Sequence, residues 1–141
     1  MSRVSFTIYG IPVAKGRPRF SRTPYGVRAV TPEKTVVYEN LVRMSYREEC
    51  LGKKLEGQIS ARIEAYFPIP KSTSKKKREA MANKETMHTK KPDADNIAKA
   101  VLDALNGIAY DDDNQICMLF VKKYYGEEPR VEVTLREIKM E

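Results

Sequence analysis

Aspartate is missing from almost the whole sequence. All six aspartates fall between residues 93 and 113, and every other acidic residue is a glutamate. Aspartate is short, disfavoured inside helices, and suited to helix caps, turns and the binding of hard cations. Such a concentration predicts caps and turns, a metal site, or both, within the carboxylate-rich stretch at residues 91–116.

Cysteine, histidine and long apolar runs are scarce as well. The two cysteines stand alone at positions 50 and 117, and the single histidine, His88, lies in a polar segment without a zinc-binding pattern. No segment approaches the roughly 18 apolar residues of a membrane span, and the first residues lack the apolar region of a secretion signal. We therefore expect a cytoplasmic protein with reduced thiols and no membrane partner.

Acidic residues are absent from residues 1–32, which carry six basic residues. Residues 71–91 carry eight basic residues against two glutamates, so each block has a net charge of +6 and the rest of the chain must carry −5 to give the total of +7. Basic blocks beside an acidic centre suit an enzyme that cuts phosphodiesters, because cations hold the backbone while carboxylates hold a divalent ion. A basic, solvated surface is the alternative interpretation.

Apolar and polar residues alternate in four segments, which predicts strands. These are residues 4–8, 59–67, 117–121 and 131–135, the last two forming a C-terminal hairpin around the turn at 126–129. The basic residues 17–30 contain a Thr-Pro-Tyr-Gly turn and are predicted to form an extended arm or a hairpin.

Three helices are predicted between these strands. The first begins with an N-cap at Thr31, ends at Gly52, and buries an apolar face. That face comprises Val36, Val37, Leu41, Met44 and Cys50 or Leu51. A short polar helix follows from Lys75 to about Asn83, capped by residues 72–74, and a third runs from about Asp95 to Asn106. The chain of 141 residues is therefore expected to form one α/β (α+β) domain over residues 1–141, with a mixed, largely antiparallel sheet packed on two main helices.

The third helix carries an apolar stripe on one side and charged residues on the other. The stripe comprises Ile97, Ala98, Val101, Leu102 and Leu105. Asp95, Lys99 and Asp103 recur every four residues and project from the opposite side. A short loop can return Asp111–Asp113 toward this helix, which predicts a carboxylate cup for Mg²⁺ with a lysine beside it.

Simpler explanations of the aspartates stay open. Asp93 or Asp95 can serve only as a helix cap, and residues 111–114 can serve only as a turn. An EF-hand that starts at Asp93 is excluded, because Ala98 and Ala104 occupy the positions of its required glycine and glutamate. The concentration of aspartates, with Lys99 beside Asp103, still favours a metal site.

Three ordered segments resemble the core of RusA-family Holliday junction resolvases. They are residues 91–99, 103–107 and 112–116, and the basic residues 12–19 are similar to the family's N-terminal segment. The resemblance implies an endonuclease that acts as a homodimer on four-way DNA junctions, depends on Mg²⁺ (with Mn²⁺ as a substitute), and leaves 5′-phosphate and 3′-hydroxyl ends.

The resemblance also implies which residues act. The essential carboxylates, which are also the metal ligands, map onto Asp93, Asp95 and Asp113, and the essential lysine maps onto Lys99. Three consecutive aspartates leave the register of the third ligand open, so Asp112 is an alternative. We expect basic residues in two places to hold the DNA arms. They are Lys15, Arg17 and Arg19 in the N-terminal basic segment (residues 11–30), and Lys75, Lys76 and Lys77 in the polar helix.

The sequence thus favours a structure-selective DNA endonuclease that resolves junctions in recombination and repair. Two alternatives remain open at this point. One is a Mg²⁺ nuclease for other branched DNA or for RNA, and the other is a protein that binds junctions without cutting them.

Overall fold

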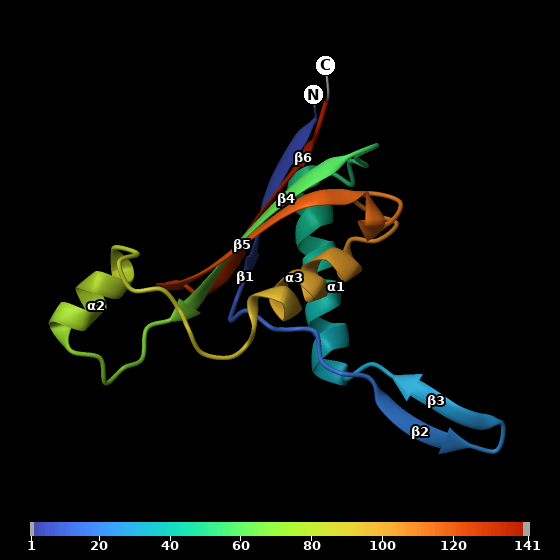
Figure 1. The fold of residues 1–141 in the computed structure, drawn as a ribbon, viewed down its shortest axis with the longest axis horizontal. Coiled ribbons are helices and arrows are strands. Elements are labelled where there is room, and N and C mark those ends of the chain that lie inside the picture. The colour runs from blue at the N-terminus through green and yellow to red at the C-terminus, as the bar shows by residue number, and fades with distance from the viewer. Residues whose placement is uncertain (1, 140–141) are drawn as a thin grey trace.

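A four-stranded mixed sheet forms the centre of the structure, a computed structural model that describes residues 2–139 (Figure 1). Its strands are β1 (Arg3–Tyr9), β4 (Ile59–Pro68), β5 (Ile116–Gly126) and β6 (Arg130–Glu137). They are arranged in the order β1-β6-β4-β5. Each strand lies where alternation of apolar and polar residues predicts it. The first half of β5 departs from the predicted burial, because Cys117 and Leu119 are exposed there.

Two of the three strand pairs are antiparallel. β6 pairs with both β1 and β4 in antiparallel register, whereas β5 runs parallel to β4. The C-terminal strands β5 and β6 follow one another across a short turn and run in opposite directions, as in a hairpin, but β4 lies between them. The expected mixed, largely antiparallel sheet is confirmed.

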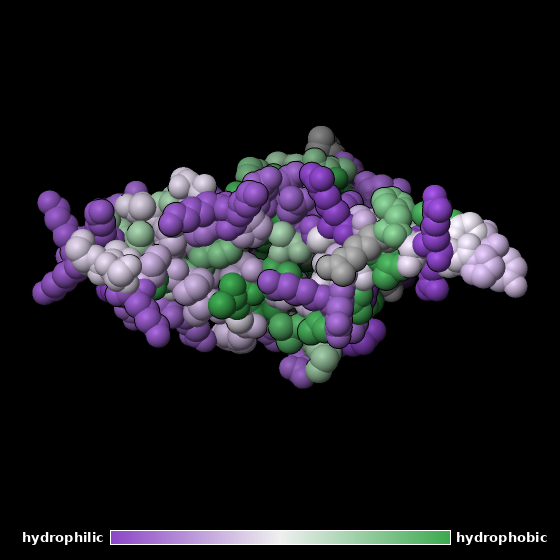
Figure 2. Space-filling view, turned by 90° about the horizontal axis from the view of Figure 1, so that it is seen from below, coloured by the Kyte–Doolittle hydropathy of each residue, from purple (hydrophilic) through white to green (hydrophobic). Residues whose placement is uncertain are grey.

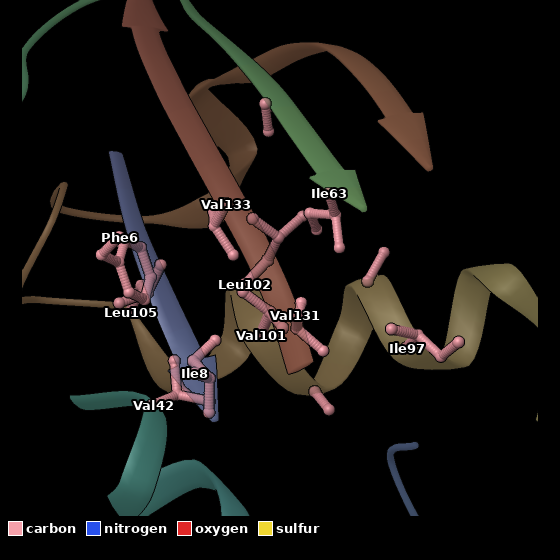
Figure 3. Packing of buried hydrophobic residues seen from close by; sticks show 14 of the residues in the cluster. Phe6, Ile8, Val42, Ile63, Ile97, Val101, Leu102, Leu105, Val131 and Val133 are labelled. Carbon is pink, nitrogen blue, oxygen red and sulfur yellow. The ribbon is translucent and has the colours of Figure 1, made fainter. Parts of the chain in front are cut away.

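The buried face of the sheet packs against helix α3 (Ala94–Ala104) and helix α1 (Glu33–Cys50). In Figure 3, apolar side chains of α3 meet those of β1, β4 and β6. The labelled residues are Phe6, Ile8, Val42, Ile63, Ile97, Val101, Leu102, Leu105, Val131 and Val133. The apolar stripe predicted for α3 is buried throughout. Truncation of a buried Leu or Ile to Ala costs about 2–5 kcal/mol, so this stripe fixes α3 firmly to the sheet.

Helix α1 buries a different face from the one predicted. Its buried residues are Thr35, Tyr38, Glu39, Val42 and Tyr46. Four residues predicted to be buried, Val36, Val37, Leu41 and Met44, are between 39% and 61% exposed, and Leu51 is 88% exposed. The prediction was wrong because tyrosine has a large apolar body and its polar tip can still be satisfied. Tyr46 illustrates this, since its ring packs edge-on against Phe6 at 5.2 Å and its hydroxyl donates to the Lys53 carbonyl.

The predicted N-cap of α1 was also wrong. The cap position is Pro32, which provides no side-chain hydrogen bond, and the helix begins at Glu33. Proline has no side-chain acceptor and no N–H of its own to satisfy, so α1 starts without a side-chain cap.

Helix α2 (Lys75–Ala82) and the hairpin of β2 (Arg19–Thr23) and β3 (Gly26–Val30) project in opposite directions from the sheet (Figure 1). Both were predicted. The Ser74 side chain caps α2 by accepting the N–H of Lys77, and no residue of α2 is buried. Every residue of β3 is exposed. Over the described residues, no helix has the length and apolar composition needed to cross a membrane.

His88 does not lie in a polar environment, contrary to the sequence-based placement. Its ring stacks on Phe67 at 3.8 Å, meets Tyr125 at 5.1 Å, and is 9% exposed. Burial, followed by the charges of Lys123 and Lys90, lowers the pKa of His88. A neutral, packed His88 therefore anchors the segment that leads from α2 to Asp93.

Candidate active site

Helix α3 presents its three charged residues along one side, starting from an exposed N-terminus. Asp93 occupies the N-cap position but makes no side-chain cap hydrogen bond, and Asp95 lies in the first turn. The cap function that could have accounted for Asp93 is therefore not used, and its carboxylate remains available. The peptide bond between Lys91 and Pro92, just before the helix, is cis.

The aspartates after α3 have separate roles. Asp112 caps the short helix η1 (Asp113–Gln115), because its carboxylate accepts the N–H of Asn114 at 3.1 Å and Gln115 completes a capping box. Asp111 pairs with Lys54 at 2.5 Å and is largely exposed. Asp113 is held differently, because its N–H donates to the Asn106 side chain at 2.8 Å and its carboxyl group faces α3. This arrangement favours Asp113 over its two neighbours as a ligand.

The carboxyl groups of Asp103 and Asp113 lie within hydrogen-bonding reach of each other. Burial raises the pKa of Asp113, and the hydrogen bond and negative charge of Asp103 raise it further, with a contribution from Asp112. Two adjacent carboxylates resist ionising together, and a bound cation relieves that repulsion. The donor set of hard, anionic oxygens therefore fits a divalent ion such as Mg²⁺.

Two lysines balance part of this negative charge. Lys15 Nζ lies 3.0 Å from Glu39 Oε2 and 3.5 Å from Asp103 Oδ2. Lys99 Nζ lies 3.7 Å from the same Asp103 oxygen, and its side chain is 61% exposed. Lys15, predicted to contact DNA, is thus already paired inside the site, whereas Lys99 is mostly free to turn toward a ligand.

The position of Lys15 depends on the glycine that follows it. The Gly16 N–H donates to Thr35 Oγ1 at 2.9 Å, and a Cβ on Gly16 would lie 2.9 Å from both that oxygen and Pro32 Cγ. The Lys15 N–H donates to the Asn96 carbonyl at 3.0 Å. Only glycine allows this close approach, so the basic segment is held between α1 and α3.

Sequence reasoning missed two members of this cluster. Glu39 was not considered, because the apolar residues of α1 indicated the wrong buried face. Asp103 was predicted to project from the charged side of α3 but was given no function, and the structure places it beside Lys15, Lys99 and Asp113. The spacing with Asp95 and Lys99 was the available signal for Asp103.

The structure does not gather Asp93, Asp95 and Asp113 into one group. Among residues 2–139, no three His, Cys, Asp or Glu side chains lie close enough together to hold a metal ion. Asp95 and Asp103 are eight residues apart, or about 12 Å along the helix axis, and Asp113 lies beside Asp103. Mg²⁺ usually takes one or two carboxylates and completes its shell with water and substrate phosphate, so a bound strand would have to contribute ligands.

The residues predicted to hold DNA lie on both sides of this cluster. Arg17 and Lys75–Lys77 are exposed and form no ion pair within the described part of the chain. The side chain of Arg19 lies outside the described atoms. Figure 2 shows hydrophilic side chains projecting at the end of the molecule that α2 forms, on the left. DNA binding by these residues stays a prediction.

The similarity of this chain to known proteins extends over all the residues of the candidate active site. The family model described as endodeoxyribonuclease RusA matches residues 10–136, which include both Lys15 and the carboxylate-rich stretch at residues 91–116. The chain is also 43% identical over 143 residues to the Bacillus subtilis (strain 168) protein YqaN, itself described as uncharacterized, with 98% of this chain and 99% of that protein covered. Nucleases generally use divalent metal ions, which agrees with the chemistry of the carboxylates.

Replacing Asp113 by Asn should raise the melting temperature of the metal-free protein by a few degrees, because it removes one charge from an unfavourable carboxylate pair at nearly constant size. Thermal melting in EDTA at pH 7.5 measures this effect. Mg²⁺ should then stabilise the wild type more than the variant. Asp111→Asn is the matched control and should change neither result. A variant that melts below the wild type in EDTA would show that the two carboxylates do not repel one another.

Proposed function

The chain belongs to the endodeoxyribonuclease RusA family, and we propose on this basis that it resolves four-way DNA junctions by Mg²⁺-dependent hydrolysis in recombination and repair. Family membership makes it an endodeoxyribonuclease of the Holliday junction resolvase type. The observation that carries the finer proposal is the contact between Asp103 and Asp113 beside Lys99. A repulsive carboxylate pair next to a largely exposed lysine is suited to binding a cation and a phosphate together.

Asp93, Asp95 and Asp113 are the proposed metal ligands, and the proximity of Asp103 to Asp113 makes Asp103 a further candidate for the same ion. Mg²⁺, or Mn²⁺ in its place, would polarise a phosphoryl oxygen and lower the pKa of a bound water. Asp112 supports Asp113 by capping η1, which fixes the direction in which Asp113 points. Asp103 holds Lys99 and Lys15 at the site through its Oδ2.

Lys99 is the proposed stabiliser of charge on the scissile phosphate. Its only ion pair in the described chain is the 3.7 Å contact with Asp103, and its side chain is mostly exposed. Lys99 can therefore turn toward a phosphate that approaches the N-terminal half of α3. Its attraction to that phosphate becomes stronger as negative charge develops in the transition state. Lys15, held by two carboxylates, instead offsets the negative charge of Glu39 and Asp103.

The exposed basic residues on either side supply the proposed grip on the junction arms. Arg17 leads into the β2–β3 hairpin, and Lys75–Lys77 begin α2 at the other end of the molecule. Exposed cations that bind phosphates release counterions, so binding should weaken steeply as salt rises. The same proposal places the protein in the cytoplasm, which agrees with Cys50 and Cys117 being free thiols.

Replacing Asp95 by Asn should abolish cleavage of a four-way junction while leaving junction binding nearly unchanged, because the amide keeps the size of the ligand but loses its charge. Lys99→Met should lower the cleavage rate by about 100-fold or more. Gel assays with labelled junctions, flaps, plain duplex and structured RNA, each with Mg²⁺ or Mn²⁺, measure the rates.

Asp111→Asn is the control for this assay and should cleave normally. Preferred cleavage of flaps or RNA by the wild type would favour the broader nuclease. A wild type that binds junctions but never cuts them with either ion would leave only the junction-binding alternative.

A homodimer is part of the proposal, because two equivalent strands of a junction must be cut and a twofold pair presents two equivalent sites. The unexpected apolar surface of α1 supports it. Val37 and Leu41, with Val13 and Tyr38, line a hollow of about 410 Å³. An exposed apolar patch of this kind is characteristic of a protein–protein contact, and a second copy of the same helix offers a matching surface.

Leu41→Glu should therefore raise the dimer dissociation constant by at least about tenfold, because it places a charge in the apolar contact. Sedimentation equilibrium over a range of protein concentrations measures the constant. Arg47→Glu, an exposed change on the same helix outside the patch, should leave it unaltered. Equal dimerisation by Leu41→Glu and the wild type would remove α1 from the interface.

A further inference from the structure

The second face of the sheet carries a basic hollow that the proposed active site does not use. Strand residues alternate, so those between the buried ones point away from α1 and α3. Three arginines from three strands, Arg3, Arg62 and Arg136, line a hollow of about 450 Å³ on this open face. Two hydroxyl residues, Ser60 and Thr134, also line it.

The arginines are placed where they repel one another. Arg3 of β1 is directly opposite Arg136 of β6, and Arg62 of β4 is opposite Thr134, the residue two before Arg136. Like charges directly opposite in an antiparallel pair destabilise a sheet. Within the described residues, none of the three forms an ion pair. An anion in the hollow would remove this repulsion.

The acidic residues of the face do not supply that anion. Glu64 lines one side of the hollow but makes no ion pair with the arginines. It is opposite Glu132, whose carboxylate pairs instead with Arg130 at 2.7 Å. On the open face, Arg130 thus neutralises Glu132, and the three arginines of the hollow are left without a paired carboxylate.

We propose that this hollow binds a backbone phosphate of a DNA strand that continues from the carboxylate site around the β5 edge of the sheet. Guanidinium groups bind phosphate oxygens through paired hydrogen bonds, and hydroxyl groups add further donors. This proposal rests on the proposed function in one respect, because the DNA strand in the hollow is the same strand that the active site holds for cleavage.

Phe120 supports a nucleic-acid strand over a small anion. Its ring is 47% exposed at the rim of the hollow, and the Arg62 guanidinium lies 6.0 Å from the ring centroid. An exposed aromatic ring beside arginines is a surface on which a base can stack. Phe120 is seven residues beyond Asp113 along the chain, hence within about 23 Å of it, which a strand of several nucleotides can span.

The test uses the double variant Arg62→Gln/Arg136→Gln on the Asp95→Asn background, where binding is measured without cleavage. Anisotropy of a labelled four-way junction across a range of salt concentrations gives the affinity and its salt dependence. We expect the double variant to bind about tenfold more weakly at a fixed salt concentration. The slope of log affinity against log salt should become shallower by about one, the value for one lost phosphate contact.

Arg47→Gln, an exposed arginine of α1 away from the hollow, is the matched control and should change neither quantity. Arg62→Lys/Arg136→Lys should give an intermediate loss, because the charge remains but the paired hydrogen bonds do not. Melting curves of the double variant should be no lower than those of the parent, since the substitutions relieve like-charge repulsion. A lower melting temperature would contradict that part of the argument.

Unchanged affinity and slope in the double variant would overturn the proposal. Inorganic phosphate that stabilises the parent but not the double variant, with junction binding equal in both, would assign the hollow to a small phosphate and overturn the DNA assignment. A wild type that binds junctions through these arginines yet never cleaves them would contradict the proposed function alone and leave the binding site intact.

Discussion

The contact between Asp103 and Asp113 is the constraint on which the rest of the site depends. Two carboxylates approach each other only if the fold holds them there, and each element contributes to that hold. The apolar stripe of α3 fixes Asp103 to the sheet, the Asn106 side chain and the Asp112 cap fix η1, and Lys15 approaches Asp103 from the N-terminal segment. Burial in the core thus offsets a local repulsion, as is common where a protein prepares a cation site.

The length of α3 has a second consequence for the site. Asp95 and Asp103 lie on one side of the helix but about 12 Å apart along its axis, with Lys99 between them. The protein therefore presents a row of carboxylate, lysine and carboxylate rather than a closed cage. A metal ion in such a row draws the remaining ligands from water and from the substrate, which couples metal binding to the arrival of DNA. The arginine hollow on the open face would extend the same path, because it lies on strands that begin or end near η1.

The sequence was sufficient to predict elements whose pattern is local. The strands, the β2–β3 hairpin, the cap of α2 and the stripe of α3 each follow from residue spacing and turn chemistry. The prediction was wrong where two faces of one helix were both partly apolar, because only the tertiary structure decides that Tyr38 and Tyr46 are buried rather than Val37 and Leu41. For the same reason the burial of Glu39, which lies on the face of α1 that Tyr38 and Tyr46 occupy, was not predicted. For the aspartates, spacing identified the row on α3, but the contact between Asp103 and Asp113 depends on how the loop returns, which no local pattern encodes.

Paramagnetic broadening by Mn²⁺ in a ¹H–¹⁵N NMR spectrum tests most directly whether these carboxylates form one metal site. Substoichiometric Mn²⁺, with an uncleavable junction bound, should broaden the amide signals of residues 93–99 and 111–115 together. The same titration on Asp113→Asn should lose the effect in both segments or weaken it strongly. Broadening confined to one of the two segments, or centred on Glu64 and Glu132 of the open face, would contradict a shared site built from α3 and η1.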